Sequence, residues 1–139
     1  MQVHHGRGYV YAIEYHIVWC VKYRRKVLSE CIEQRLRTLL ITAAMENGVI
    51  IEEFNCDRDH VHLLVSATPH TNLTGLIKSM KGRSARTLFL EFPYLKKYLY
   101  GGHLWNPLYF IATVSENTEA QIRDYIRSQK EKITPWHLR

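Results

Sequence analysis

The sequence predicts an α+β fold, with a ferredoxin-like, split β-α-β-β-α-β antiparallel sheet and an added C-terminal helix that carries a tyrosine. Strand-like and helix-like segments follow one another in the order that defines this pattern. Two of the strands are joined by only a short polar turn, which indicates an antiparallel hairpin. The 139 residues show no internal repeat and no linker, so residues 1–139 are expected to form a single domain.

The first half of the chain is predicted to supply one strand, one helix and then the hairpin. Residues 8–21, GYVYAIEYHIVWCV, are rich in β-branched and aromatic residues and predict a long first strand. A helix is expected over residues 29–48, between a serine N-cap and an Asn-Gly stop signal. Residues 49–56 and 60–67 follow as the second and third strands, separated by the turn DRD.

The second half is predicted to add a helix, a strand and a last helix. Apolar residues recur on one side of residues 72–92, which predicts a helix that Pro93 ends. Residues 108–114, LYFIATV, are expected to form the fourth strand. A Thr-x-x-Gln capping box places the start of the last helix near Asn117 or Thr118. In folds of this pattern, the first and third strands are expected at the centre of the sheet.

Composition narrows the class of partner and the compartment. Lys and Arg number 19 against 13 Asp and Glu, an excess that attracts phosphate polymers and acidic membrane surfaces alike. The sequence contains no run of about 18 apolar residues and no signal peptide, so we expect no membrane span. The three cysteines are widely spaced and form no CxxC, which indicates free thiols in a reducing cytoplasm.

Two histidines interrupt the predicted third strand, HVHLLVSA. Alternation along a strand puts His60, His62 and Leu64 on one face and the intervening apolar residues on the other. Two residues of strand span roughly 6.6 Å, so two imidazoles can converge on one small object. That object is a metal ion, an anion or water. A histidine near an apolar run is otherwise most often a core residue whose polar atoms are satisfied.

The last predicted helix places Tyr125 and Gln129 one above the other, because they are four residues apart. An amphipathic tyrosine that packs through its ring is the commoner role for Tyr125. A long amide beside it, however, has little use on a packing face unless it coordinates or hydrogen-bonds something. Two histidines do not close a structural zinc site, which needs four ligands. A third, neutral oxygen ligand would instead leave coordination positions open for a substrate, as in a catalytic Lewis acid.

Five segments, in this order, carry a resemblance that covers essentially the whole chain. They are YHIVWCVKYRR (15–25), DHVHLLVSA (59–67), LIKSMKGRSAR (76–86), LWNPLYFIATVSENT (104–118) and IRDYIRSQ (122–129). With them, the sequence resembles the single-tyrosine transposases of bacterial and archaeal insertion sequences, within the HUH (His-hydrophobe-His) endonuclease superfamily. The histidine pair precedes the tyrosine, as in transposases and replication initiators.

The resemblance implies a role for each member of this group. His60 and His62 would be metal ligands, with Gln129 as the third, and Tyr125 would attack a DNA phosphodiester. The family forms a 5′-phosphotyrosine link and a free 3′-hydroxyl, which later attacks that link and joins strands. The implied ion is Mg²⁺ or Mn²⁺, although imidazole ligands alone do not exclude zinc.

Asp57 and Asp59 flank the histidines in the turn CDRD. We expect both to act as turn residues whose side chains bond to the backbone. In the alternative arrangement, the turn rotates Asp57 toward the metal ligands.

The basic residues of two segments are expected to contact DNA phosphates, each with a plain solvated charge as the alternative. Together they would give a salt-sensitive attraction that does not depend on sequence, while Tyr and Arg side chains suit stacking on unpaired bases. The candidates are Lys22, Tyr23, Arg24, Arg25, Lys78, Lys81, Arg83 and Arg86. The resemblance further implies single-stranded DNA with hairpins at the element ends as substrate. It also implies a homodimer in which the tyrosine helix of one chain completes the histidine site of the other.

Two other functions fit the same pattern. A domesticated relative that cuts chromosomal palindromes would share the chemistry, and the DNA flanking the gene would distinguish it. A non-catalytic nucleic-acid-binding module on a ferredoxin-like sheet would need aromatic residues on its central strands, where HVHLLVSA stands instead. Such a module would also show no specific response to metal.

Overall fold

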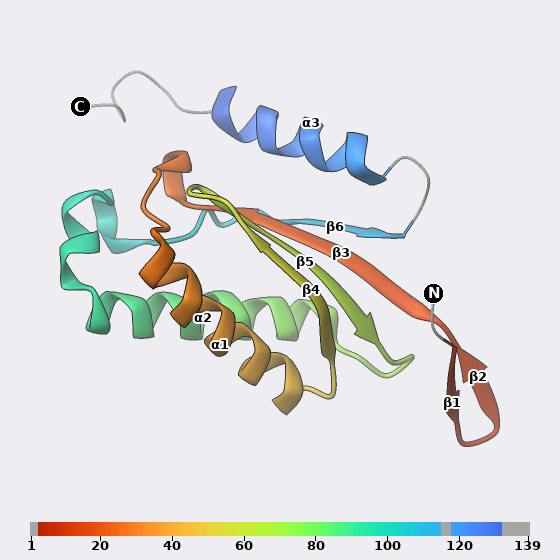
Figure 1. Cartoon of the computed structure of the whole chain (residues 1–139). Coiled ribbons are helices and arrows are strands. Elements are labelled where there is room, and N and C mark those ends of the chain that lie inside the picture. The colour runs from red at the N-terminus through yellow and green to blue at the C-terminus, as the bar shows by residue number, and fades with distance from the viewer. Residues whose placement is uncertain (1–2, 115–117, 132–139) are drawn as a thin grey trace.

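A four-stranded antiparallel sheet organises the protein, with helices on both of its faces (Figure 1). The computed structural model describes residues 3–114 and 118–131. The strands of the sheet, in the order β4-β5-β3-β6, are β4 (Ile50–Cys56), β5 (His60–Ala67), β3 (Ile13–Cys20) and β6 (Phe110–Thr113). The helices are α1 (Glu30–Glu46), α2 (Leu73–Glu91) and α3 (Thr118–Glu131). Helices α1 and α2 cover one face, and α3 lies over the other.

This topology confirms the predicted fold class. Strand β5 lies between β3 and β4 and pairs antiparallel with both, which is the split βαβ arrangement. The expected placement of the first and third strands of the pattern at the sheet centre is also correct, because β3 and β5 are the inner strands. Three short 3₁₀ segments complete the connections: η1 (Lys22–Arg24), η2 (Pro93–Lys97) and η3 (Tyr100–Gly102).

The first strand is shorter than the predicted 8–21. The beginning of the predicted strand forms β2 (Tyr9–Tyr11) instead. This short strand pairs with the preceding β1 (His4–Gly6) in a separate hairpin. The turn between them includes Gly8 at φ 81°, a left-handed conformation that glycine adopts without strain. Apolar and aromatic residues alone could not separate this hairpin from the strand that follows.

The fourth strand is likewise shorter than expected. Strand β6 covers four residues, Phe110–Thr113, where 108–114 was predicted. The backbone N–H of Leu108 donates to the side chain of Asn106 over 3.0 Å and is therefore not available to a neighbouring strand. Helix α3 begins at Thr118 within the described residues, while the alternative start at Asn117 lies outside them.

The hydrophobic core lies between the sheet and the α1–α2 layer. Val61, Leu63 and Val65 of β5 are fully buried there, as the predicted alternation requires. Burial of each such side chain stabilises the fold by about 1.5–3 kcal/mol. The helices contribute the buried residues Ile32, Leu36, Leu40 and Ala43 from α1, and Leu76, Ile77, Met80 and Leu88 from α2. The histidines of β5 consequently face the opposite side, toward α3.

Hydrogen bonds fix two helix starts. Asn72 caps α2, because its side-chain oxygen accepts the N–H of Gly75 over 3.0 Å. Ser29 occupies the N-cap position of α1, as predicted, but makes no side-chain capping bond. The Thr118 hydroxyl donates to the carbonyl of Thr113 and ties the start of α3 to the end of β6. Among the described residues, no helix combines the length and the apolar character that crossing a membrane requires.

Candidate active site

The face of the sheet under α3 carries both predicted histidines, each partly buried. In the strand register, His60 lies opposite Cys20 and His62 lies opposite Val18. Directly opposite residues of an antiparallel pair point to the same face. This face is therefore lined by imidazoles, a thiol and apolar groups, and it is distinct from the hydrophobic core.

The ring of His60 is held by an acidic neighbour. Its Nδ1 lies 2.8 Å from Oδ1 of Asp59, whose residue is only 6% exposed. Because the carboxylate oxygen accepts, Nδ1 carries the proton, and in the neutral form of this ring the lone pair is on Nε2. A ring in this tautomer is prepared to bind a metal through Nε2.

Asp59 is in turn held by Arg24. Nε and Nη2 of Arg24 donate to Oδ2 of Asp59 over 3.0 and 2.8 Å. Burial by itself would raise the pKa of Asp59, but the hydrogen bonds and charges of His60 and Arg24 outweigh burial and lower it. The expectation that Asp59 is a turn residue bonded to the backbone is therefore wrong. Its side chain turns inward, because two cationic or polar partners lie within reach there.

The second ligand candidate, His62, has a partner that sequence analysis missed. Nε2 of His62 lies 2.8 Å from Nδ1 of His16, on the neighbouring strand β3. Burial, and then the charges of His16 and His60, lower the pKa of His62. His62 is therefore neutral near pH 7, the state in which imidazole binds metals. Alternation along β3 places His16 on the same face as Val18 and Cys20. Only the register between β3 and β5, which the sequence does not give, brings it next to His62.

The predicted nucleophile, Tyr125, lies on the inner side of α3. Its ring lies over Phe110 of β6, with ring centroids 5.6 Å apart. The Tyr125 hydroxyl is buried and has no hydrogen-bond partner among the described residues. Burial, and to a smaller extent the charge of Cys20, raises the pKa of this phenol well above its ordinary value.

Gln129 also points into the structure, one turn beyond Tyr125. The residue is 3% exposed, and its Oε1 is buried without a hydrogen-bond partner among the described residues. An unpaired buried acceptor is costly, so such an oxygen is a candidate for binding a cation. The structure thus brings Tyr125 and Gln129 over the sheet face that carries His60 and His62.

The rows of the sheet give the spacing of these groups. Phe110, under the tyrosine, pairs with Val18, which pairs with His62. Two strand spacings separate Phe110 from His62, or roughly 10 Å. The tyrosine ring and the histidine pair therefore lie over the same face of the sheet.

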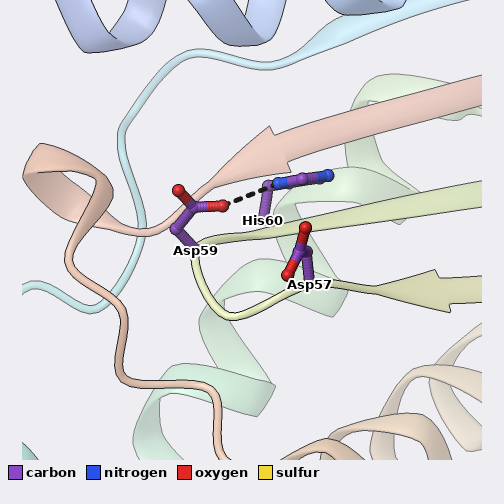
Figure 2. Close-up of side chains that lie close together, drawn as sticks. All are labelled: Asp57, Asp59 and His60. Atoms are coloured by element: carbon purple, nitrogen blue, oxygen red, sulfur yellow. Dashed lines mark hydrogen bonds and ion pairs between the residues drawn. The ribbon is translucent and has the colours of Figure 1, made fainter.

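Asp57 forms a small acidic group with its neighbours (Figure 2). One ligand atom from each of Asp57, Asp59 and His60 lies within 4.8 Å of the others, close enough to hold a divalent cation. Asp57 is exposed, and its Oδ1 accepts the backbone N–H of Arg58 over 2.8 Å, as expected of a turn residue. Both carboxylate oxygens of Asp59 are already used by Arg24 and His60. The group therefore contributes to a metal site mainly through His60.

Several cations predicted to contact DNA are already bonded to other groups of the protein, two of them in partly buried positions and one at the surface. Arg24 bonds to Asp59, and Arg83 forms an ion pair with Glu46 of α1. The ammonium of Lys81 donates to the carbonyl oxygens of Asn106 and Leu108 over 2.7 and 3.1 Å. Burial lowers the pKa of Lys81 from 10.5 to about 8. Arg24 and Lys81 therefore serve the fold first, whereas the exposed Arg83 can still reach a phosphate.

The remaining predicted DNA contacts differ in exposure. Lys78 and Arg86 are exposed on α2. The Lys22 ammonium lies 5.3 Å from the ring centroid of Tyr23, and Arg25 is partly buried beside them.

A basic cavity that sequence analysis did not predict lies next to this cluster. Its volume is about 480 Å³, and its lining includes Lys22, Lys81 and Arg86 together with Phe89 and Trp105. Positive charge beside aromatic rings suits a nucleotide. The signal was present in the sequence as separate segments, but only the fold brings them to one place.

Comparisons of the sequence with known proteins agree on one family. The sequence model of the family described as "Transposase IS200 like" matches residues 9–129. The chain is 49% identical over 132 residues to the ISDra2 transposase TnpA of Deinococcus radiodurans, covering 95% of this chain and 94% of that protein. It is 32% identical over 119 residues to the transposase for insertion sequence element IS200 of Salmonella typhimurium, covering 86% and 78%.

Solved structures agree with this result. The crystal structure of a Deinococcus radiodurans protein described as a transposase superposes with a TM-score of 0.85 at 45% identity, covering 91% of this chain and 97% of that one. A REP-associated tyrosine transposase bound to a REP hairpin superposes with a TM-score of 0.58 at 14% identity, covering 93% and 74%. The second likeness supports the fold alone.

Proposed function

The chain belongs to the IS200-like transposase family, and we propose that it cleaves and rejoins single-stranded DNA at insertion-sequence ends. A DNA-cleaving and strand-joining activity is what the family implies. The observation that best supports the detailed mechanism is a pair of buried atoms on α3, Tyr125 Oη and Gln129 Oε1, which have no hydrogen-bond partner within residues 3–114 and 118–131. Both lie over the histidine face, where a substrate and a cation would give them partners.

We expect His60, His62 and Gln129 to hold a divalent metal ion, Mg²⁺ or Mn²⁺. The donors fit such an ion: His60 is bonded through Nδ1 and leaves Nε2 for the metal, His62 is neutral, and Gln129 has a buried amide oxygen without a partner in the described part of the chain. When bound there, the ion supplies positive charge to the phosphate oxygens and so favours attack at phosphorus. Imidazole ligands alone leave zinc open as an alternative.

Tyr125 is expected to attack the scissile phosphodiester. A bond forms between Tyr125 Oη and phosphorus, the bond from phosphorus to the 3′-oxygen breaks, and the phenol proton leaves while the 3′-hydroxyl gains one. Reversal by a 3′-hydroxyl of another strand end restores the phenol and joins the strands. Neither water nor a nucleotide cofactor is consumed, because the phosphotyrosine link conserves the energy of the broken bond.

Burial of Tyr125 suits this order of events. Its raised pKa keeps the phenol protonated before substrate binds, and the positive charge of a cation held by the histidines would favour the phenolate. His60 is oriented beforehand by Asp59, whereas His62 has to exchange its hydrogen bond with His16 for the metal.

We propose that the DNA lies across the basic side of the molecule. The exposed Lys78 and Arg86, with Lys22 and Arg25, are expected to neutralise phosphates, and Tyr23 is expected to stack on an unpaired base. The cavity beside Trp105 is large enough for an unpaired nucleotide. Hairpins at the element ends are the expected recognition element; the REP-associated neighbour, which is described bound to a REP hairpin, is compatible with this expectation.

The assembly we propose is a homodimer in the cytoplasm, in which each tyrosine helix completes the histidine site of the other chain. In the single chain, α3 lies over its own histidine face and contacts β3, β6 and η1. The whole chain, 1–139, would act as one HUH domain. The 49% identity to an insertion-sequence transposase favours this function over a domesticated palindrome nuclease.

The decisive experiment is covalent capture. Single-stranded oligonucleotides that carry the element ends should become attached to the protein in the presence of Mg²⁺ or Mn²⁺, as seen on a denaturing gel. Tyr125→Phe should abolish the adduct and leave hairpin binding intact. Tyr98→Phe is the matched control, because Tyr98 is 55% exposed and lies outside the site. An adduct that persists in Tyr125→Phe would refute the assignment.

A further inference from the structure

One guanidinium connects the tyrosine helix to a histidine of the metal site. Arg24, in η1, donates to Asp59 through Nε and Nη2, and its Nη1 donates to the backbone carbonyl of Ile126 over 3.2 Å. Ile126 is the residue that follows Tyr125 in α3. Asp59 accepts from His60 with its other oxygen. A continuous chain of hydrogen bonds therefore runs from the nucleophile's helix to the first histidine.

Burial argues against the role in DNA binding expected for Arg24. Its side chain is 18% exposed and that of Asp59 is 8% exposed. Three of the five N–H groups of the guanidinium are directed at protein acceptors. Removing one partner from a buried pair leaves an uncompensated charge, so this contact constrains geometry strongly.

The backbone of η1 has an unusual conformation at Arg24, which indicates that the surrounding contacts hold this residue in place. Tyr23 and Arg24 adopt φ values of 58° and 51°, and among the described residues they are the only non-glycine residues with positive φ. Each such residue costs of order 1–3 kcal/mol unless its surroundings hold it in place. Two in succession turn the chain back under α3 and direct Arg24 at Asp59.

We propose that Arg24 is a positioning residue that sets the metal-binding histidine and the tyrosine helix together. Through Asp59, it fixes the His60 tautomer whose Nε2 faces the metal. Through the Ile126 carbonyl, it holds the tyrosine helix that lies over this histidine face, which is α3 of the same chain in the structure and α3 of the other chain in the proposed dimer. The same guanidinium donates to Oδ2 of Asp59. It therefore also disfavours binding of a cation between Asp57, Asp59 and His60, away from the proposed ligands His62 and Gln129. This inference rests on the proposed function, since it assigns His60 to the metal.

The test measures metal binding and helix protection in the full chain without DNA. Mn²⁺ titrations followed by electron paramagnetic resonance give the affinity, and amide hydrogen exchange reports on α3. Arg24→Gln should weaken Mn²⁺ binding about 10- to 100-fold, the usual effect of losing the partner that orients a metal ligand. It should also speed exchange along residues 122–129. Arg24→Lys should recover part of both, because a single charge can reach Asp59 but cannot hold both partners.

Two further variants separate positioning from general stability. Asp59→Asn keeps the bond from Arg24 to Ile126, so it should weaken Mn²⁺ binding while the exchange of α3 stays slow. Arg35→Gln removes a comparable bidentate pair, with Glu91, on the far helical layer. Arg35→Gln should change neither the Mn²⁺ affinity nor the amide exchange of α3.

Two results would overturn the inference. One is an Arg24→Gln protein that binds Mn²⁺ as tightly as the wild type and protects α3 equally. The other is an Arg24→Gln protein with intact Mn²⁺ affinity but weaker, less salt-dependent DNA binding, which would make Arg24 a phosphate contact. Failure of the proposed function is visible separately: Tyr125→Phe would then still form the adduct, while the effect of Arg24 on Mn²⁺ would remain.

Discussion

Nδ1 of His16 lies 2.8 Å from Nε2 of His62, so the nitrogen that a metal would need on His62 is already shared with a neighbouring imidazole. One of these two rings carries the proton between them. Metal binding through this nitrogen must therefore replace an existing hydrogen bond.

His16→Phe should strengthen metal binding. The ring volume is retained, but His62 no longer gives up a hydrogen bond worth about 0.5–1.5 kcal/mol, so the Mn²⁺ affinity should rise about two- to tenfold. Calorimetric titration of the DNA-free protein measures it. His5→Phe, at an exposed position in β1, is the control. Weaker binding in His16→Phe would mean that His16 supports the ion itself.

Gln129→Met should stabilise the metal-free protein and weaken metal binding. The buried Oε1 of Gln129 has no partner among the described residues, and relieving such an atom is worth about 1–3 kcal/mol. Urea unfolding without metal should give a larger free energy of unfolding for the variant. With saturating Mn²⁺ the order should reverse, since a bound ligand stabilises only the protein that binds it. A variant less stable than wild type without metal would contradict the idea that this oxygen is unpaired.

Lys81 should make stability depend on pH in the alkaline range. Its pKa is about 8 in the folded protein and 10.5 ordinarily, so between these values the unfolded chain holds a proton that the native chain has lost. Stability due to this group therefore rises from about pH 8 to pH 10.5 and is constant below pH 8. The free energy of unfolding of the wild type, relative to Lys81→Met, should increase across this window. Lys78→Met, at an exposed site on the same helix, should give no such trend.

Ser84→Ala should destabilise the wall of the basic cavity. The indole N–H of Trp105 donates to the Ser84 hydroxyl over 3.0 Å, and both residues are buried. Without this acceptor, the N–H is left unpaired at a cost of about 1–3 kcal/mol. Thermal unfolding measures the loss, and Ser84→Thr should retain most of the bond. Equal stability of Ser84→Ala and wild type would indicate that water replaces the hydroxyl.

The strand that carries the histidines was predictable because its signal is local. Alternation over HVHLLV assigns each side chain to a face without knowledge of any partner, and the burial of Val61, Leu63 and Val65 agrees. The inward side of α3 was predictable for the same reason, since Tyr125 and Gln129 repeat at helical spacing.

The partners of these residues were not predictable, because they come from distant parts of the chain. Arg24 and Asp59 are 35 residues apart, and His16 and His62 are 46 apart. Their approach depends on strand register and on the left-handed turn at Tyr23, neither of which a composition or a period encodes. The basic cluster KYRRK consequently looked uniform, although one of its arginines is committed to the interior.

Laboratory selection would expose a conflict at position 23. A library sorted for heat resistance should enrich glycine or asparagine there, since these residues accept the left-handed turn more readily than tyrosine. The more flexible backbone would then allow the guanidinium of Arg24 to adopt several orientations. The same library sorted for strand joining should keep the tyrosine, so the two selections would diverge at a residue that touches neither metal nor scissile bond.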